Sequence, residues 1–523
     1  MSDNPDAVVA QAEAPGYLSH RQIRIVLGGL MAGMFLAALD QSILGTALPR
    51  ITSELGGLDK LSWVVTAYLL TSTAATPLWG KISDLYGRRI IFQAAITLFV
   101  IGSMLSGLAW SIEALIGFRA IQGLGGGGLF ALALAVIGDV IPPRERGRYQ
   151  GYFGAVFGTS SVLGPVLGGW FTEGPGWRWI FYINVPIGIA ALVVTSVALT
   201  MPVVRRDHKI DYLGASVIVS AVTCLLLYTA WAGPDHGWGS SLGLSLLVAG
   251  ALLTLLFVLV ESRVSEPIIP LELFRDSVFS LSITYTFITG FAMFGAMIFI
   301  PMYLQVVDGM SPTISGLAML PMVVGIFSTS ISSGLVMTRT GRYKIFPVMA
   351  AVTITVALLL LSSLDVDTPY WQTAVAIYVM GAGLGLQMQV LVTVVQNSVD
   401  RRHMGSATSS VTFFRQMGGS FGTAVFGAII TSQVAAYLAE LLPGLPPAQM
   451  PSTSDVEAIQ QLPPEVREPV VQAFSLSMHD AFLAAVPVVV VALLVAALIK
   501  ERPLTTRQSA AAEAEAEATA VPH

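Results

Sequence analysis

Long apolar runs separated by short polar connections occupy the chain from about residue 25 to residue 499. A helix crosses the hydrocarbon core of a bilayer in about 20 residues, which is the usual length of these runs. We count fourteen of them, at residues 25–48, 61–80, 89–109, 112–135, 148–170, 178–200, 211–231, 241–261, 277–304, 313–337, 344–363, 371–394, 405–432 and 478–499. The pattern predicts an all-α polytopic membrane protein with fourteen transmembrane helices.

Composition agrees with this pattern. Hydrophobic residues make up 54% of the 523 residues and charged residues only 11%, whereas about a quarter of a soluble domain is charged. The single cysteine, Cys224, lies in an apolar run, so we expect neither an intramolecular disulfide nor a cysteine metal site. The first 20 residues are polar and acidic and lack the pattern of a cleaved signal peptide, so we expect them to be retained.

The loop charges predict the orientation, because Lys and Arg accumulate on the cytoplasmic side of a membrane protein. The alternate loops and tails that include both termini hold 21 Lys and Arg, and the opposite loops hold four. Arg119 and Arg415 lie inside predicted spans. We therefore expect a multi-pass protein of the cell (inner) membrane with both termini in the cytoplasm.

A repeated loop divides the chain into two halves. The loop from Gly80 to Arg89 follows the second span, and its spacing Gly-x6-Gly-Arg recurs from Gly334 to Arg342 after the tenth. Duplicated halves are an architecture of transporters. The predicted parts are a cytoplasmic tail (1–24), an N-terminal six-helix bundle (25–200), an inserted transmembrane hairpin (211–261), a C-terminal six-helix bundle (277–499) with an outside loop (433–477), and a disordered cytoplasmic tail (500–523).

Asp40 is the only ionisable residue of the first span. An unpaired carboxylate in hydrocarbon costs several kcal/mol or takes up a proton. Arg119 of the fourth span lies at a similar depth, about 10–12 Å below the outer surface at 1.5 Å per residue, so the two can face each other. They form either a static structural pair or the group through which protons and cargo are exchanged. We favour exchange, because an arginine this close would control the proton of Asp40.

The loop from Gly80 to Arg89 joins two helices within about eight residues, and its glycines allow a tight approach. Asp84 can accept hydrogen bonds from the N–H groups that begin a neighbouring helix. The whole pattern, Gly-x3-Asp-x2-Gly-Arg-Arg, resembles the signature loop of the major facilitator superfamily. Four consecutive glycines of the fourth span, Gly125 to Gly128, favour close helix packing rather than a phosphate site, since no Gly-x4-Gly-Lys-Ser/Thr occurs.

The fifth span combines glycines with the intramembrane Pro165. Such residues can simply kink a helix and let its neighbours approach. The pattern Gly-x5-Gly-Pro-x2-Gly-Gly, however, resembles the motif that marks antiporters within the same superfamily. Together with Leu39-Asp40, the aromatic segment from Trp177 to Gly188, and the segment from Phe414 to Gly419, it makes residues 25–499 resemble the fourteen-span drug/proton antiporters of the QacA and EmrB type.

The resemblance implies roles for three groups of residues. Asp40 and Arg119 would couple transport to protons. A cytoplasmic latch that holds the outward-facing state would comprise Gly80, Asp84, Gly87, Arg88 and Asp139, and an antiporter hinge would comprise Gly158, Gly164, Pro165, Gly168 and Gly169. We expect no catalytic residue, metal or cofactor, because the proton gradient would drive the cycle.

Polar or aromatic residues at mid-span are candidates for the substrate cavity, although each can equally be a packing contact: Tyr68, Gln122, Tyr152, Tyr303, Gln387, Gln389, Gln396, Phe413, Arg415 and Gln416. Arg415 is a predicted buried cation. Either Gln416, Gln387 or backbone carbonyls satisfy it, or it meets an anionic group of the cargo. We expect no acid within the C-terminal spans, which argues against dicationic substrates.

These features predict a proton-coupled antiporter that exports hydrophobic or amphipathic compounds, drugs among them, by alternating access with one proton per cycle. Such an activity would contribute to antibiotic resistance. The alternative on the same fold is an exporter of an endogenous lipid, siderophore or other metabolite. No metal cluster or nucleophile–base pair lies within the spans, so we do not expect an enzyme. Expected partners are protons, a small-molecule substrate and membrane lipids, with no nucleic acid, and we expect a monomer.

Overall fold

The computed structural model describes residues 20–55, 60–141, 146, 152, 156, 158–160, 163–164, 166–172, 174–199, 211–232, 236–442, 459–460, 462–502 and 504. Every regular element in this part of the chain is a helix. The predicted tails fall largely outside the described residues, and the fifth span is described only in part.

The N-terminal half is built on four long helices and two shorter ones: α1 (His20–Leu55), α2 (Leu61–Tyr86), α3 (Arg88–Gly107), α4 (Ile112–Val140), α6 (Trp179–Tyr182) and α7 (Asn184–Ala198). Gly87 alone separates α2 from α3, with a φ of 94° that favours glycine. Ser111 caps α4 by accepting a hydrogen bond from the Ala114 N–H at 3.2 Å. These short connections leave α4 packed along both α2 and α3.

Two helices lie between the halves in sequence and pack on each other: α8 (Tyr212–Leu227), which continues into a π-helical turn, η3 (Tyr228–Ala232), and α10 (Ser241–Glu261). Val217 and Ile218 of α8 share one apolar cluster with Ala74 of α2 and Phe413 of α16. Most apolar side chains of α10 are exposed, as lipid contact requires. The pair therefore touches both halves, and its origin as an insertion stays a prediction.

The C-terminal half consists of η4 (Leu271–Arg275), α11 (Ser277–Val306), α12 (Pro312–Ala318), α13 (Leu320–Thr340), α14 (Ile345–Ser362), α15 (Tyr370–Ser398), η5 (Arg401–His403), α16 (Met404–Leu441) and α18 (Pro464–Leu498). Gly341 ends α13 in the left-handed conformation, with a φ of 70° and a ψ of 3°. Gly87 ends α2 with a positive φ of 94° but an extended ψ of 143°. The repeated Gly-x6-Gly-Arg spacing therefore places a glycine with positive φ at each turn, although the two turns differ in shape.

Twelve helices of the described chain are long and apolar enough to cross a membrane: Gln22–Leu44, Arg88–Gly107, Ile112–Val140, Trp179–Ala198, Tyr212–Trp231, Ser241–Glu261, Ser277–Val306, Ile314–Thr340, Ile345–Ser362, Tyr370–Ser398, Met404–Leu441 and Pro464–Leu498. Of the two other predicted spans, 61–80 lies in α2 and 148–170 is described only in part. The count of fourteen stays a prediction.

Two helices of the C-terminal half extend well beyond their predicted spans. Because α16 continues to Leu441 and α18 begins at Pro464, helix enters the predicted outside segment 433–477 from both ends. Its location outside the membrane stays a prediction. Proline in the first helical turn sacrifices no intrahelical hydrogen bond, so it does not prevent the early start. Gln433 and Tyr437 donate hydrogen bonds to Asp480 Oδ2 at 3.0 and 2.8 Å, which joins the two extensions.

Asp480 also corrects the expectation that the C-terminal spans hold no acid, because it lies within α18 and inside the predicted span 478–499. About 18 residues separate it from the last residue of α18, which at 1.5 Å per residue places it about 27 Å from that inner end. It therefore lies near the outer surface, where its carboxylate accepts the hydrogen bonds from Gln433 and Tyr437.

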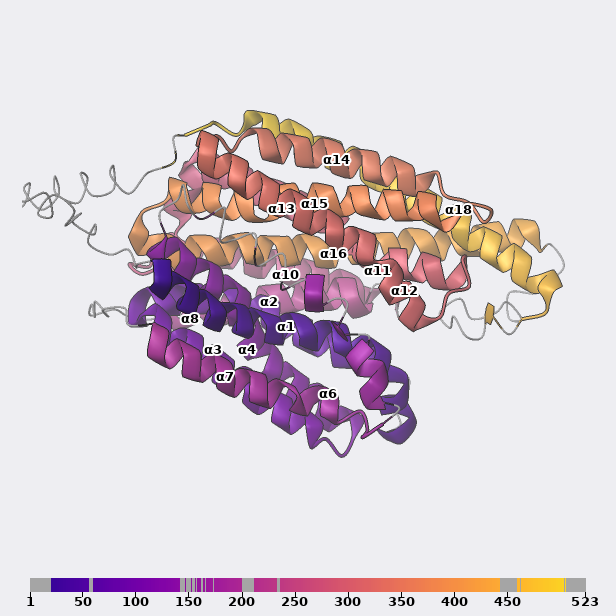
Figure 1. Cartoon of the computed structure of the whole chain (residues 1–523), viewed down its shortest axis with the longest axis horizontal. Coiled ribbons are helices and arrows are strands. Elements are labelled where there is room, and N and C mark those ends of the chain that lie inside the picture. Colours follow the sequence, from indigo (N-terminus) through magenta and orange to yellow (C-terminus); the bar gives the residue numbers. More distant parts are fainter. Residues whose placement is uncertain are drawn as a thin grey trace, which may run out of the picture.

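The two halves lie side by side with their helices along the long axis of the molecule (Figure 1). Their contact runs along α2 and α16. At one end Asp84 of α2 meets Gly405 and Ser406 of α16, and the ribbons of the halves diverge toward the opposite end (Figure 1). The structure is thus closed at the end that the loop charges predict to be cytoplasmic.

Candidate functional site

Asp40 and Arg119 form a buried ion pair in the interior of the N-terminal half. Both side chains are 1% exposed, and Arg119 Nη1 lies 2.5 Å from Asp40 Oδ2. The other carboxylate oxygen, Oδ1, accepts hydrogen bonds from Gln122 Nε2 at 2.7 Å and from Asn184 Nδ2 at 3.2 Å. The pairing that the sequence predicts is present, and both carboxylate oxygens are satisfied, which a buried ion pair requires.

Arg119 is held by α4 and α2 together. Gln122 lies three residues further along α4 and so shares a helical face with Arg119, whose Nη1 donates to Gln122 Oε1 at 2.8 Å. The guanidinium carbon lies 4.3 Å from the centroid of the Tyr68 ring, a cation–π distance. Arg119 Nε donates to the Val64 carbonyl at 3.4 Å. The cation therefore has a fixed orientation toward Asp40.

Two residues of this network were not assigned a role from the sequence. Asn184 begins α7, and its Nδ2 also donates to Ser103 Oγ of α3 at 3.0 Å. Both side chains are completely buried. An amide inside the apolar stretch 178–200 is a signal that sequence reasoning can use, whereas a serine in a transmembrane helix is too common to single out Ser103.

The glycine run of α4 brings this network together. A Cβ on Gly123 would lie 2.4 Å from the Tyr68 carbonyl oxygen, and one on Gly127 would lie 2.2 Å from the Ser72 carbonyl oxygen, both in α2. On the other side, a Cβ on Gly125 would lie 2.4 Å from the backbone nitrogen of Phe99 in α3. The expectation that these glycines serve close packing is confirmed, and the packing sets the distance from Arg119 to its partners.

The predicted hinge touches α1 next to Asp40. Ser42 Oγ donates to the Ser160 carbonyl at 2.7 Å, and a Cβ on Gly164 would lie 2.1 Å from Ser42 Oγ. Further along the same segment, a Cβ on Gly158 would lie 2.4 Å from Val323 Cγ1 of α13. This segment therefore connects the Asp40 helix with the C-terminal half.

The remaining hinge residues differ in their surroundings. Gly168 is buried and its carbonyl accepts a hydrogen bond from Thr172 Oγ1 at 2.8 Å. Gly169 has open space where a Cβ would point, so close packing does not require glycine there. Pro165 lies outside the described residues.

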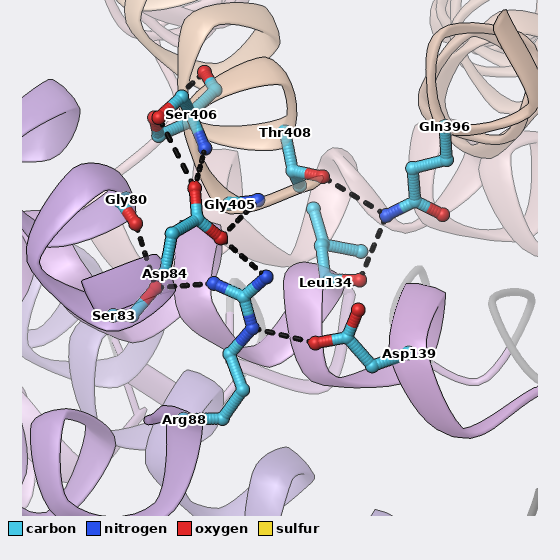
Figure 2. A network of polar contacts seen from close by, with 11 residues as sticks. Gly80, Ser83, Asp84, Arg88, Leu134, Asp139, Gln396, Gly405, Ser406 and Thr408 are labelled. Atoms are coloured by element: carbon cyan, nitrogen blue, oxygen red, sulfur yellow. Dashed lines mark hydrogen bonds and ion pairs between the residues drawn. The ribbon is translucent and has the colours of Figure 1, made fainter. Parts of the chain in front are cut away.

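The predicted latch residues form a connected cluster at the inner end (Figure 2). Asp84 Oδ1 accepts from the Gly405 N–H and Asp84 Oδ2 from the Ser406 N–H, both at 2.9 Å, where α16 begins. Arg88 joins Asp84 to Asp139, at 2.6 Å from each carboxylate. This geometry matches the expectation that Asp84 caps the start of a neighbouring helix.

The latch is tightly packed as well as charged. A Cβ on Gly80 would lie 2.1 Å from Ser409 Oγ and 2.7 Å from the Gly405 carbonyl oxygen. Asp84 lies beyond the predicted span 61–80. Burial raises the pKa of its carboxyl above the usual range, while Arg88 and the Ser406 N–H act in the opposite direction.

A second contact closes the same end of the molecule. Gln396 Nε2 of α15 donates to the Leu134 carbonyl of α4 at 2.9 Å and to Thr408 Oγ1 at 3.1 Å (Figure 2). Arg146 Nη1 donates to Gln396 Oε1 at 3.2 Å. Gln396 is therefore an inter-half contact in this conformation, and its place in the substrate cavity stays a prediction.

The segment from Glu261 to Asp276 connects both halves at this end, which the sequence analysis did not foresee. Lys81 Nζ lies 2.6 Å from Glu266 Oε2. His403 Nε2, just before α16, lies 2.9 Å from Glu272 Oε1. A cavity of about 870 Å³ lies between these groups, and its charged lining suits water rather than an apolar cargo.

The other cavity candidates fall into three groups. Tyr68 and Gln122 belong to the Asp40 network. Tyr303 is buried near the outer end of α11, where its hydroxyl donates to the Asp365 carbonyl at 2.8 Å. The third group has no shared location. Phe413 is buried and packs edge-on against Phe414, whereas Tyr152 is exposed. The side chain of Gln389 lies outside the described residues.

Gln387, Arg415 and Gln416 remain near the middle of the C-terminal half. Gln387 and Arg415 line one small cavity between α11, α15 and α16. Gln416 instead faces α2, where Thr76 Oγ1 lies 3.5 Å from its Oε1. None of the polar groups expected to satisfy Arg415 is bonded to it within the described chain.

The sequence profile of the Major Facilitator Superfamily matches residues 30–423. The chain belongs to this superfamily. It is 44% identical to an uncharacterized MFS-type transporter of Mycobacterium tuberculosis, over 93% of this chain and 71% of the relative. It is 35% identical to a multidrug transporter protein of Bacillus subtilis (80% and 77% covered) and 33% identical to multidrug resistance protein 3 of the same organism (93% and 97%).

Solved structures agree on the fold of this superfamily member. The proton:xylose symporter XylE superimposes with a TM-score of 0.62 at 14% identity, over 95% of this chain and all of the symporter. The curated relatives of this chain support its place among the drug-efflux members of the superfamily. The chain is a multi-pass membrane transporter rather than an enzyme. Membership of the fourteen-span QacA/EmrB type stays a prediction.

Proposed function

We propose that this protein exports hydrophobic or amphipathic compounds, drugs among them, in exchange for protons. The relatives that are named multidrug transporters support the export of drugs. The loop charges support placement in the cell (inner) membrane with both termini in the cytoplasm.

The observation that carries the proton coupling is the buried Asp40–Arg119 pair. An ion pair that serves stability alone could be replaced as a pair by apolar residues at little cost, because buried ion pairs contribute little net stability. Here one carboxylate gathers donors from two helices, α4 and α7, beside a helix that contacts the hinge. In such an arrangement, a change in the charge of Asp40 alters its hydrogen bonds to several helices at once.

Asp40 exchanges its proton only after this pocket opens. Its partners enclose it in the conformation with a closed inner end, so a second conformation has to separate Asp40 from Arg119, Gln122 or Asn184. We propose that the hinge segment withdraws from Ser42 to open the pocket. Asp40 is deprotonated when cargo enters from inside, and a proton arriving from outside neutralises it and displaces the cargo.

The latch determines which side is open in this cycle. With Asp84 bonded to the start of α16, the inner end is closed and the outward-facing state is favoured. Release of Asp84 and of Gln396 opens the inner side for the next cargo. One buried Asp40–Arg119 pair predicts one proton per cycle.

Replacement of Asp40 tests the proposal. In proteoliposomes with an imposed pH gradient, we expect Asp40→Asn to reduce gradient-driven efflux of a lipophilic dye by about two orders of magnitude. The purified wild type should also release protons when a transported compound is added, and Asp40→Asn should not. Asp367→Asn, which changes an exposed acid of an outer loop, is the matched control. Full gradient-driven efflux by Asp40→Asn would overturn the proposal.

A further inference from the structure

Arg415 is a cation without a partner in the middle of the C-terminal half. It is the twelfth residue of α16, about 16 Å from the start of that helix at 1.5 Å per residue. Its side chain is partly buried. No hydrogen bond or ion pair to the guanidinium is formed by any residue that the structure describes. Charged residues at this depth almost always pair with another group and mark the path of a substrate or ion.

The surroundings of Arg415 hold polar groups and no negative charge. A small cavity of about 10 Å³ lies beside it, and none of its lining residues on α11, α15 and α16 is acidic. The Gln387 side chain in this cavity is 5% exposed and its Oε1 has no partner. Thr286 and Thr289 line the same cavity but donate their hydroxyl hydrogens to their own helix, at 2.7 and 2.9 Å.

The described acids of the C-terminal half lie too far away to neutralise Arg415. Asp365 and Asp367 are exposed in an outer loop, and Asp308 follows the outer end of α11. Asp480 is bonded to Gln433 and Tyr437 near the outer surface. The guanidinium therefore keeps its donors free for a group that does not belong to this half.

We propose that Arg415 and Gln387 bind the anionic group of an amphipathic cargo, so that the transported compounds include organic carboxylates and sulfonates. This inference rests on the proposed export function and specifies its substrate class. A guanidinium offers paired N–H donors that match two oxygens of such a group, and the Gln387 amide can supply a further donor.

The cavity beside Arg415 is small in this conformation. It has space for about one water-sized sphere, so a carboxylate or sulfonate head binds there only when the side chains around it move apart during the transport cycle. Met293 and Met388 border the same cavity. Their flexible, polarizable side chains can adapt to apolar bodies of different shape. The site therefore selects for the charge of the head while tolerating variety in the rest of the molecule.

Matched probe pairs test the proposal in proteoliposomes and in detergent. Each pair keeps the apolar body and changes the head: naphthalene-2-sulfonate with its sulfonamide, and naphthalene-2-carboxylate with its carboxamide. We expect the wild type to bind the charged members at least tenfold more tightly than the neutral ones. Arg415→Gln should remove this preference, and Arg415→Lys should keep part of it. Arg263→Gln, the same change at an exposed position, is the control.

The outcomes separate this proposal from the export function. Equal binding of charged and neutral members by the wild type, or an unchanged preference in Arg415→Gln, would overturn the anion site. If lipophilic dyes are still exported along the pH gradient in that case, the export function stands. If no dye is exported while the charged probes bind through Arg415, the export function fails and the anion site stands.

A free inorganic anion offers the same chemistry as a cargo head group, so the experiment includes chloride. Thermal unfolding of the wild type and of Arg415→Gln is measured in sodium chloride and in sodium gluconate, with and without the sulfonate probe. Stabilisation of the wild type by the probe in gluconate supports the cargo assignment. Stabilisation by chloride alone, with no competition from the probe, would assign the site to an inorganic ion and overturn the proposal.

Discussion

The two halves of this protein share a repeated loop but treat their buried charges differently. In the N-terminal half, Asp40 and Arg119 neutralise each other and are bonded on all sides. In the C-terminal half, Arg415 lies at mid-depth with no bonded partner among the described residues. The contrast suggests a division of labour in which the N-terminal half holds the proton and the C-terminal half recognises the cargo.

The same contrast recurs at both surfaces. At the outer end of the N-terminal half, Glu54 accepts a hydrogen bond from Trp177 Nε1 at 2.9 Å. At the outer end of the C-terminal half, Asp308 has a buried Oδ2 without a partner. At the inner end, the first loop has Asp84 where the second has Thr338. Asp84 reaches across to the other half through bonds to Gly405 and Ser406, and the Thr338 hydroxyl donates to the Gly334 carbonyl of its own helix.

The largest expected effect comes from removing one arginine from each half. Arg119→Met leaves the Asp40 carboxylate buried without its cation, and breaking a buried pair costs about 3–5 kcal/mol. Arg415→Met removes a cation that has no partner, so we expect no loss of stability or a small gain. Thermal unfolding of the purified variants in one detergent measures both.

A double variant sharpens this comparison. Asp40→Asn combined with Arg119→Met should recover much of the stability that Arg119→Met alone loses, because no uncompensated charge remains. Equal destabilisation by Arg119→Met and Arg415→Met would contradict the difference between the halves.

The next effect concerns the two repeated loops. Asp84→Asn weakens charge-assisted hydrogen bonds that are worth about 1.5–3 kcal/mol, so the inner end should open more often. Thr338→Val removes an uncharged hydroxyl, which donates to the Gly334 carbonyl. A neutral hydrogen bond is worth only about 0.5–1.5 kcal/mol, so we expect a smaller change. The labelling rate of a cysteine introduced at Ser409, in a Cys224→Ser background, measures opening of the inner end.

We expect Asp84→Asn to speed labelling by about tenfold, which corresponds to 1.4 kcal/mol. Similar labelling rates in the Asp84→Asn and Thr338→Val variants would show that the two loops contribute equally to closure. The two halves would then not differ at the inner surface.

The sequence predicted the Asp40–Arg119 pair because the two charges lie at one depth of two apolar helices, where each has few alternatives. It also predicted that Asp84 would cap a helix, because its loop and charge fit that role. It did not predict which helix, since the start of α16 is brought to Asp84 only by the packing of the two halves.

Other structural features could not be predicted from the sequence, for physical reasons. Hydropathy marks the apolar part of a helix and not its polar ends, so the predicted spans stop short of Leu441 in α16 and begin after Pro464 in α18. Polar mid-span residues look alike in sequence, whether they bond within one half, as Gln122 does, or between halves, as Gln396 does.

A smaller effect is expected where the halves touch most closely. Gly80→Ala places a Cβ 2.7 Å from the Gly405 carbonyl oxygen, and relief of such a clash typically costs about 1–3 kcal/mol. Because the clash exists only when the inner end is closed, the variant should favour the open state. Gly117→Ala is the control, since nothing lies within 4 Å of its Cβ. Equal Ser409→Cys labelling rates in both variants would argue against close approach at Gly80.

The smallest effect concerns the acid at the outer end of the C-terminal half. Burial raises the pKa of Asp308 from 3.8 to about 6. Between about pH 4 and pH 6 the folded protein therefore binds more protons at this site than the unfolded chain, so stability falls as pH rises through this window. The shift corresponds to about 3 kcal/mol at full burial, and solvent screening of this partly exposed group reduces it to about 1 kcal/mol.

Asp308→Asn removes this dependence, so it should unfold at a higher temperature than the wild type above pH 6 and at the same temperature below pH 4. Asp367→Asn, an exposed neighbour at the same surface, should follow the wild type throughout. A variant Asp308→Asn that is less stable than the wild type at pH 7 would mean that the charged carboxylate has a partner there. The C-terminal half would then compensate its outer charge as the N-terminal half does, and Arg415 would remain its one unpaired charge within the membrane-spanning part of the described chain.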